Sequence, residues 1–543
     1  MDHKTKHLIK ERIMKIIQAI KDHFRICGDD ISANCVKESA FSYRNFAFVL
    51  LAWMFIWTVW PSLCVGNVFI DVAENIAWGS NFQFGYDKNP YFGAWFSCGV
   101  FRICPSEYMF YLMSQLAVFL GLSATYFLML DVTGDRFAAF AAGVTALLIP
   151  FFSHSATEFN DDVMSIAFWG LSAFCFYRGV SRDSWKYWLA AGFFFGLALM
   201  TKYLAGVLML PMGILLLTTR EGRRCWKRPG VYLAMAVFLL LILPNLIWLC
   251  QHDFIAITYA CRRAGLDQSS GGWLDHVSNA WSPIEDFLTR LILPAAALLI
   301  LRRGPKKELA AFGRKVILYA ALGPLILSSL FALVTGGMVL VSWLTPYFVF
   351  ATPLLVMWYR PVPERFTFKL FAGFVILAAT LTVLMFGFEY LHKRPYIKQG
   401  GYNAWPGRVI AEQLTRSWNE KYGKPIPYVI GNRKESCNFV FYSPDRPIAF
   451  FDHSVELSPW IDPADVRKRG AVILWIGNEP PPYLEFYADR LVMQPDIETE
   501  LAGAKWYRKL AGPLRRLTIH AAFASPEEEA GSVPAPDGKT DGK

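Results

Sequence analysis

Residues 71–95, DVAENIAWGSNFQFGYDKNPYFGAW, are the starting point for the fold assignment. They directly follow the first long apolar segment of the chain. Asp71 and Glu74 are three residues apart and would share one face of a helix. Residues 85–90, GYDKNP, have the composition of a turn and contain Lys88. A carboxylate pair and a lysine therefore lie where a membrane segment meets water. This pattern fits a site for chemistry on an anionic lipid-linked substrate, and it fits equally an amphipathic loop with capping acids.

Long apolar runs dominate the 543-residue chain. Its hydrophobic fraction is 54%, which soluble domains also approach, so the clustering of these residues decides the class. Many runs approach about 20 residues, which is enough to cross the hydrocarbon of a bilayer. We expect a polytopic α-helical membrane protein with about eleven spans. They lie near 46–64, 108–130, 137–152, 163–179, 187–201, 203–219, 231–250, 287–301, 316–335, 339–358 and 370–388.

The distribution of basic residues predicts the orientation in the membrane. The net charge of +10 arises largely from short loops between apolar runs, which favours membrane loops over a nucleic-acid surface. Loops 178–186, 220–229, 302–315 and 360–369 are the basic ones, and all four fall on one side if the spans alternate. Cytoplasmic loops carry such an excess of Lys and Arg. We therefore expect a cytoplasmic N-terminus and residues 71–95 outside.

The composition changes after residue 389. Residues 428–431, 448–451 and 471–475 have the character of short strands, and 409–421 that of a helix. An odd number of spans places this small α/β domain outside the membrane. The expected organisation has four parts: a cytoplasmic N-terminal segment 1–45, a transmembrane domain 46–389, an extracytoplasmic α/β domain 390–522, and a disordered tail 523–543.

Two further polar groups lie at predicted span ends on the outer side. The first is Glu158-Phe-Asn160-Asp161-Asp162, whose carboxylates could orient an acceptor or hold a divalent ion through oxygen ligands. Capping of a helix by Asp161 explains the same residues equally well. The second is Lys202, which either meets a lipid phosphate or extends to the membrane interface. Ionisable residues at such positions are functional candidates.

Residues 71–95 resemble the first extracytoplasmic loop of the GT-C class of membrane glycosyltransferases. The similarity is to bacterial relatives of the dolichyl-phosphate-mannose–protein mannosyltransferases, which include the aminoarabinose and galacturonic acid transferases that modify lipid A. The residues that fit the family pattern are Asp71, Glu74, Gly79, Gly85, Tyr86, Lys88, Pro90 and Trp95. Asn89 replaces the usual His and Tyr91 the second Pro, which leaves the sugar and the acceptor open. Residues 160–162 and 196–203 also resemble family motifs. The resemblance covers nearly the whole chain.

The resemblance implies a sugar transferase that acts at the outer face of the bacterial inner (plasma) membrane. Its donor would be a polyprenyl-phosphate-linked sugar, and its acceptor lipid A, core or another glycan, or a protein. A carboxylate would take or orient the acceptor proton, and cations would stabilise the departing phosphate. The implied catalytic residues are Asp71, Glu74 and Asp162. The implied substrate-binding residues are Lys88, Tyr86, Asn160, Asp161, Lys202 and Tyr203. Metal dependence stays open, with a divalent ion as one alternative.

Two other functions compete with this one. A transporter or flippase of lipid-linked sugars would also be polytopic, but transporters favour inverted repeats and charges near the membrane midplane. We find no internal repeat, and the charged groups lie at predicted span ends. A membrane scaffold with an outer binding domain is the third alternative, and the boundary charges argue against it only mildly. The sequence also lacks a phosphate-binding glycine loop of the nucleotide-binding type, and a lipid-linked donor requires none.

Overall fold

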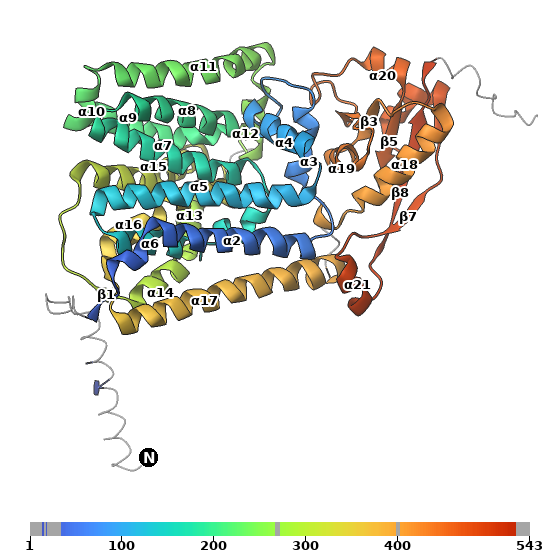
Figure 1. Cartoon of the computed structure of the whole chain (residues 1–543). Helices are drawn as coiled ribbons and strands as arrows, with labels where there is room; N and C mark the ends of the chain where they lie inside the picture. Colours follow the sequence, from blue (N-terminus) through green and yellow to red (C-terminus); the bar gives the residue numbers. More distant parts are fainter. Residues whose placement is uncertain (1–13, 16–17, 19–33, 267–271, 398–401, 528–543) are drawn as a thin grey trace, which may run out of the picture.

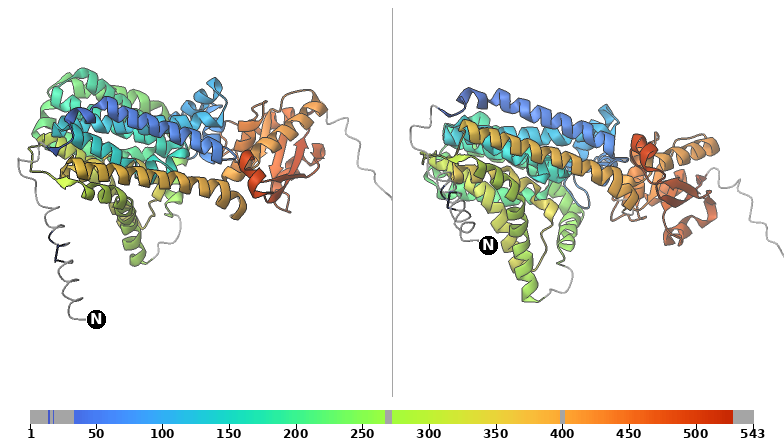
Figure 2. Two further views of the ribbon diagram at one scale, coloured as in Figure 1. Left: turned by 60° about the horizontal axis from the view of Figure 1, so that its bottom comes forward. Right: turned by 90° about the horizontal axis from the view of Figure 1, so that it is seen from below.

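The computed structural model has two parts, a long helical bundle and a smaller α/β domain at one end of it (Figure 1). It describes residues 14–15, 18, 34–266, 272–397 and 402–527. Figure 2 shows from two further directions that the C-terminal domain lies beyond one end of the bundle. Most of the predicted N-terminal segment 1–45 lies outside the described residues.

Six helices are long and apolar enough to cross a membrane. They are α2 (Tyr43–Cys64), α5 (Glu107–Thr133), α7 (Asp161–Arg182), α11 (Pro229–Gln251), α15 (Ala311–Thr335) and the segment Arg365–Tyr396, which begins with α17 (Arg365–Gly387). Two bent pairs raise the number to eight if each is one span. They are α6 (Arg136–Ala146) with Pro150–Thr157, bent by 91°, and η6 (Val341–Val349) with α16 (Ala351–Tyr359), bent by 49°.

The predicted count of eleven spans is not confirmed. Three predicted spans correspond to shorter helices within the described residues. They are α8 (Trp185–Thr201), α9 (Gly206–Thr218), and α14 (Ile292–Ile300), which follows α13 (Trp273–Arg290). The apolar runs were located correctly, but a run of hydrophobic residues does not show where the helix within it begins and ends: α8 has 17 residues, α9 has 13 and α14 has nine. The polytopic helical class is confirmed.

Helices α5 and α7 form the centre of the bundle, and their packing holds the first turn of α7 in place. In the most apolar 18-residue stretch of α5 and of α7, 61% and 72% of the residues are buried, against 17% for the segment that contains α17. Glycines allow the close approach: a Cβ on Gly121 would lie 2.6 Å from the Ile166 carbonyl oxygen, and one on Gly170 would lie 2.7 Å from that of Gly121. Small residues permit such packing between membrane helices. The acidic first turn of α7 is therefore held rigidly.

The segment after α2 folds into two short helices, α3 (Ile70–Gly79) and α4 (Tyr91–Ile103). The predicted turn at 85–90 joins them, with a bridge between Gly85 and Pro90 and a 3.0 Å hydrogen bond from the Tyr86 N–H to the Asn89 carbonyl. The two helices pack closely at Gly79, whose Cβ would lie 2.2 Å from the Ala94 carbonyl oxygen. Lys88 is thus carried on a tight loop that faces α3.

The C-terminal domain contains a six-stranded mixed sheet in the order β4-β3-β5-β8-β6, with β7 also paired to β8. The three predicted strands have the predicted bounds: β3 (Tyr428–Gly431), β4 (Ile448–Phe451) and β5 (Ala471–Trp475). The remaining strands are β6 (Leu491–Met493), β7 (Ile497–Glu500) and β8 (Arg516–Ala524). The helices are α18 (Gly407–Tyr422), α19 (Arg433–Tyr442), α20 (Pro463–Arg469) and α21 (Lys505–Ala511).

The boundary predicted for the disordered tail begins too early. Phe523 and Ala524 are fully buried residues of β8, because the last strand pairs with both β5 and β6. Residues 528–543, the larger part of that tail, lie outside the described residues.

Helix α19 joins the C-terminal domain to the membrane domain. It packs against α3, and Asn67 Nδ2 donates a 2.8 Å hydrogen bond to Asn438 Oδ1. The Tyr442 hydroxyl donates to Glu107 Oε2 at 2.6 Å and accepts from the Val68 N–H at 2.9 Å. These buried polar contacts fix the first turn of α19 over the region that holds Asp71 and Lys88.

Candidate active site

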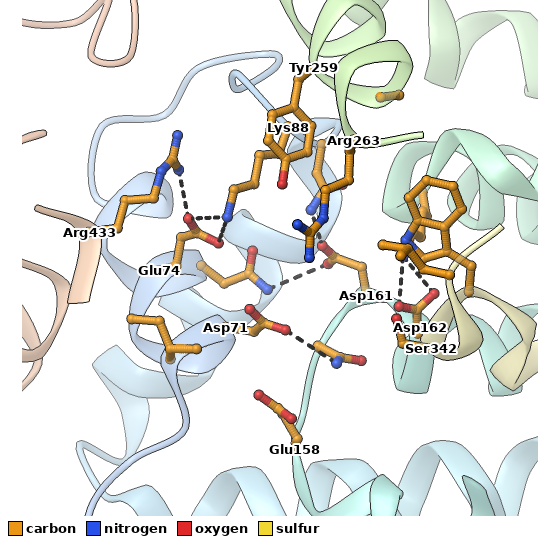
Figure 3. Close-up of a pocket in the computed structure, with 18 of the residues that line it drawn as sticks. Asp71, Glu74, Lys88, Glu158, Asp161, Asp162, Tyr259, Arg263, Ser342 and Arg433 are labelled. Atoms are coloured by element: carbon orange, nitrogen blue, oxygen red, sulfur yellow. Dashed lines mark hydrogen bonds and ion pairs between the residues drawn. The ribbon is translucent and has the colours of Figure 1, made fainter. Parts of the chain in front are cut away.

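A cavity of about 780 Å³ lies between the ends of the bundle helices and the C-terminal domain. Its polar lining comes from α3, the loop before α4, the first turn of α7, and α12 (Ile255–Arg263), together with the start of α19 (Figure 3). Eight of the nine side chains singled out from the sequence line it. They are Asp71, Glu74, Lys88, Asn160, Asp161, Asp162, Lys202 and Tyr203.

Asp71 is a carboxylate of the cavity lining with a polar partner from the start of α7. It lies in the first turn of α3, and Asn160 Nδ2 donates a 3.3 Å hydrogen bond to its Oδ2. Within the described chain, no cation lies within ion-pairing distance of its oxygens. Burial raises the pKa of Asp71, and the neighbouring Glu74 raises it further. Burial and Asp71 likewise raise the pKa of Glu158 to about 8, so that Glu158 is mostly protonated at neutral pH.

Glu74 has the opposite environment. Lys88 Nζ lies 2.7 Å and 2.9 Å from its two carboxylate oxygens, and Arg433 Nη1 lies 2.6 Å from Oε1. Burial opposes ionisation of Glu74, but Lys88 and Arg433 outweigh it and lower its pKa. Burial alone would also lower the pKa of Lys88, yet Glu74 raises it. Glu74 and Lys88 are thus a charged pair.

Arg433 is the functional candidate that the sequence did not reveal. It is the first residue of α19 and contacts two acids of the membrane domain, Glu74 and Asp87, the residue before Lys88. Its guanidinium also lies 5.7 Å from the centre of the Trp78 ring. The local sequence gives little indication of a functional role, because Asn-Arg-Lys after a strand is a common sequence at the capped start of a helix. Arg433 contacts Glu74 across about 360 positions of sequence, and a local sequence pattern cannot predict such a contact.

The first turn of α7 presents two acids in different directions. Asn160 caps the helix by accepting from the Val163 N–H at 3.0 Å, so the cap predicted at Asp161 belongs instead to the residue before it. Asp161 is therefore free to accept a 2.6 Å hydrogen bond from Asn89 Nδ2. Asp162 forms an ion pair with Lys202, whose Nζ lies 2.6 Å and 2.7 Å from its oxygens.

The cavity lining also includes two tyrosines and an arginine. Tyr203 donates a 3.0 Å hydrogen bond to Asn245 Oδ1. Lys88 Nζ lies 5.8 Å from the ring centre of Tyr259 on α12. Arg263 from the same helix points into the cavity in Figure 3, where it lies near Lys88 and Asp161.

Tyr86 is the one predicted site residue that the structure keeps away from the cavity. It is fully buried and stacks on Trp78 with ring centres 5.3 Å apart. Its motif match thus marks a packing position rather than contact with a substrate. The described residues also contain no group of three or more His, Cys, Asp or Glu side chains arranged to hold a metal ion, so the divalent ion considered from the sequence has no evident ligand set.

The chain is similar to known proteins in part of its sequence and in its fold. Residues 88–248 match the family model of dolichyl-phosphate-mannose-protein mannosyltransferase. The crystal structure of ArnT from Cupriavidus metallidurans bound to undecaprenyl phosphate superposes over 88% of this chain and 97% of that one, with a TM-score of 0.55 and 15% identity. The family match and the ArnT-like fold support the resemblance to the GT-C class of membrane glycosyltransferases. A curated relative is similar in sequence, the lipid A galacturonosyltransferase RgtD of Rhizobium johnstonii, at 28% identity over 191 residues.

The extent of these similarities differs. The match to RgtD covers 34% of this chain and 39% of that protein, so the shared region is less than half of either protein. The match to ArnT extends over both the helical bundle and most of the C-terminal part, and at this identity it concerns the fold.

Proposed function

We propose that this GT-C protein transfers a sugar from a polyprenyl-phosphate-linked donor to a hydroxyl group of an envelope acceptor. The observation that carries this proposal is a shared cavity. It holds Asp71, a carboxylate with no ion-pair partner among the described residues, together with the cations Lys88, Arg263 and Lys202. A base is needed on the acceptor side of a sugar transfer and positive charge on the leaving-group side. The cavity supplies both.

The donor and acceptor classes rest on the relatives. ArnT was crystallised with undecaprenyl phosphate, and RgtD is a lipid A galacturonosyltransferase. For this chain we infer a polyprenyl phosphate as the carrier and lipid A as the first acceptor to examine, with core or other glycans and protein as further acceptors. A galacturonic acid donor is the first choice for an assay, and an aminoarabinose donor the second.

The proposed reaction is a single displacement. The acceptor oxygen forms a bond to the anomeric carbon while the bond from that carbon to the phosphate oxygen breaks. The acceptor proton passes to Asp71, and the bonding electron pair leaves with the lipid phosphate. Lys88 carries a positive charge at neutral pH and stabilises this developing charge, and Lys202 and Arg263 assist. Glu74 holds Lys88 in place, and Asp162 does the same for Lys202.

We also propose that the C-terminal domain and the cavity face the outside of the inner membrane. The basic loops at the opposite end of the bundle support this orientation. A membrane-impermeant maleimide should label a cysteine placed at exposed Glu479 from outside the cell. It should label one placed at Lys227 only after the membrane is permeabilised. The background chain would carry serine at Cys250 and Cys261, the exposed native cysteines of the described residues. The reverse labelling pattern would contradict the orientation.

A transfer assay tests the function directly. The purified chain in lipid nanodiscs would be mixed with undecaprenyl-phosphate-linked galacturonic acid and lipid A, and the products analysed by mass spectrometry. We expect sugar-modified lipid A together with free undecaprenyl phosphate. Movement of the donor lipid across a vesicle membrane, with no product from any of the three acceptor classes, would favour the flippase alternative instead.

A further inference from the structure

A second hollow lies at the end of the bundle away from the C-terminal domain, where α10 (Arg220–Cys225) joins α9 to α11 (Figure 1). It has two adjoining parts, an apolar groove of about 340 Å³ and a basic hollow, which share Leu217 and Trp226. We propose that this groove binds one anionic glycerophospholipid, with an acyl chain in the apolar part and the phosphate on the basic part. This binding site is separate from the proposed active site.

The apolar part lies between α9 and α11, with α8 as its floor. Its floor is formed by the buried Trp188 and by Phe195. Met212 and Gly213 line the side of α9, and Phe238 lines the side of α11. The groove opens outward beside Leu217 and Met235, whose side chains are 62% and 46% exposed. Such an opening toward the membrane admits a hydrocarbon chain and no polar ligand.

The basic part continues from the end of this groove. It is lined by Arg220, Arg223, Arg224 and Lys227, four exposed cations on and just after α10. Basic hollows at helix ends on the cytoplasmic side bind the phosphates of anionic lipids, and each cation near the membrane surface contributes favourably. The charge of the hollow and the apolar character of the groove therefore require a ligand that has both an anionic head and a chain.

Trp226 supplies a separate indication at the junction. Its indole N–H is buried and has no hydrogen-bond partner in the described structure, although the residue lines both parts. A buried donor of this kind loses free energy unless an acceptor is provided. The phosphate or ester oxygen of a phospholipid, placed between the chain and the cations, would provide that acceptor. Soluble phosphate would satisfy the N–H but would leave the apolar groove unfilled.

Gly213 allows the groove to be filled without disturbing the fold. A Cβ at this position meets no atom within 4 Å, although Gly213 lines the groove. Gly213→Phe should therefore occupy the space of the acyl chain. A matched control is Gly373→Phe on α17, where a Cβ also meets nothing within 4 Å. Arg224→Gln combined with Lys227→Gln removes two cations and leaves the groove open.

The experiment is native mass spectrometry of the delipidated full chain titrated with phosphatidylglycerol, phosphatidylcholine or undecaprenyl phosphate. We expect wild type and Gly373→Phe to retain one phosphatidylglycerol at least tenfold more tightly than phosphatidylcholine. Gly213→Phe should lose this retention, and the double charge variant should weaken it about tenfold or more, as expected from the loss of two cations. Thermal unfolding of each variant establishes that it is folded, and Gly213→Leu replaces Gly213→Phe if the larger residue prevents folding.

Three outcomes would overturn the proposal. Equal retention of phosphatidylglycerol and phosphatidylcholine would show that the basic hollow does not select a head group. Unchanged retention by the groove and charge variants would place the bound lipid elsewhere. Tighter binding of undecaprenyl phosphate than of phosphatidylglycerol, lost in the same variants, would assign the groove to the carrier lipid instead.

Discussion

At the scale of single residues, two acids that are three positions apart on one helix have different environments in the cavity. Glu74 has two cationic partners that lower its pKa, whereas burial raises the pKa of Asp71. A base must be deprotonated yet hold a proton well enough to remove it from a hydroxyl, and a raised pKa favours this. This contrast supports the proposed roles, in which Asp71 is the base and Glu74 positions Lys88.

Lys88→Ala should weaken use of the lipid-linked donor strongly, because it removes the cation proposed to stabilise the phosphate and also leaves Glu74 with one partner fewer. Loss of one such group typically costs about 10²–10³ in rate. Lys88→Arg keeps the charge and should cost less. The measurement is kcat/KM for the donor. Lys468→Ala, an exposed lysine of α20, is the control, and equal activity of Lys88→Ala and this control would exclude the role.

The sequence could predict most of the candidate site because charges at the ends of apolar runs are unusual and therefore visible. Asp71, Asp162 and Lys202 were found in this way. The contacts between them were not predictable, since Lys202 reaches Asp162 across 40 positions and Arg433 reaches Glu74 across 359. The misplaced cap on α7 has a simpler cause: Asn160 and Asp161 are both good capping residues, and only the backbone decides which one begins the helix.

At the scale of elements, α4 is shaped to admit the side chain of Asp161. A Cβ on Gly93 would lie 2.0 Å from Asp161 Oδ1, so no other residue fits without moving that carboxylate. Gly93→Ala should therefore lower kcat/KM by about tenfold or more, because small displacements at a site are costly. Gly99→Ala on the same helix, where nothing lies within 4 Å, should stay within about threefold of wild type. Equal effects of the two substitutions would show that the position of Asp161 is unimportant.

The strands of the C-terminal domain show where element prediction succeeds. Strands β3, β4 and β5 are continuous apolar runs buried in a parallel arrangement, and their bounds were predicted correctly. Strands β7 and β8 carry charged residues such as Glu498 and Arg516 at exposed positions. The apolar pattern that indicates a strand is therefore weaker in these two segments. Their pairing is antiparallel and joins segments distant in sequence.

At the scale of the whole molecule, Arg433 makes the active site depend on the C-terminal domain. Arg433→Gln would leave Asp87 and Glu74 buried without that partner, and breaking one side of a buried ion pair is strongly destabilising. Asp87→Asn should relieve part of this loss. We expect the double variant to be at least about tenfold more active than Arg433→Gln alone, since residues in contact are not additive.

The measurements for this pair are kcat/KM for the donor and the thermal unfolding temperature. Arg446→Gln is the control, because Arg446 also belongs to the C-terminal domain and lies 4.5 Å from the ring centre of Phe101 on α4, outside the cavity lining. Additive effects of Arg433→Gln and Asp87→Asn would contradict the coupling. A loss of activity equal to that of Arg446→Gln would reduce Arg433 to an ordinary interface residue.

The central claim is that Asp71 accepts the acceptor proton, and the most direct measurement is the pH dependence of kcat/KM for purified Asp71→Asn and wild type. Wild-type activity should rise with pH through a pKa above the ordinary aspartate range, because the base works only when deprotonated. Asp71→Asn should lose that acidic limb and about 10²–10⁴ in rate. The control is Asp253→Asn, where the backbone has φ of 50°, a conformation that Asn adopts readily. Activity of Asp71→Asn within about threefold of wild type, with the acidic limb unchanged, would contradict the account.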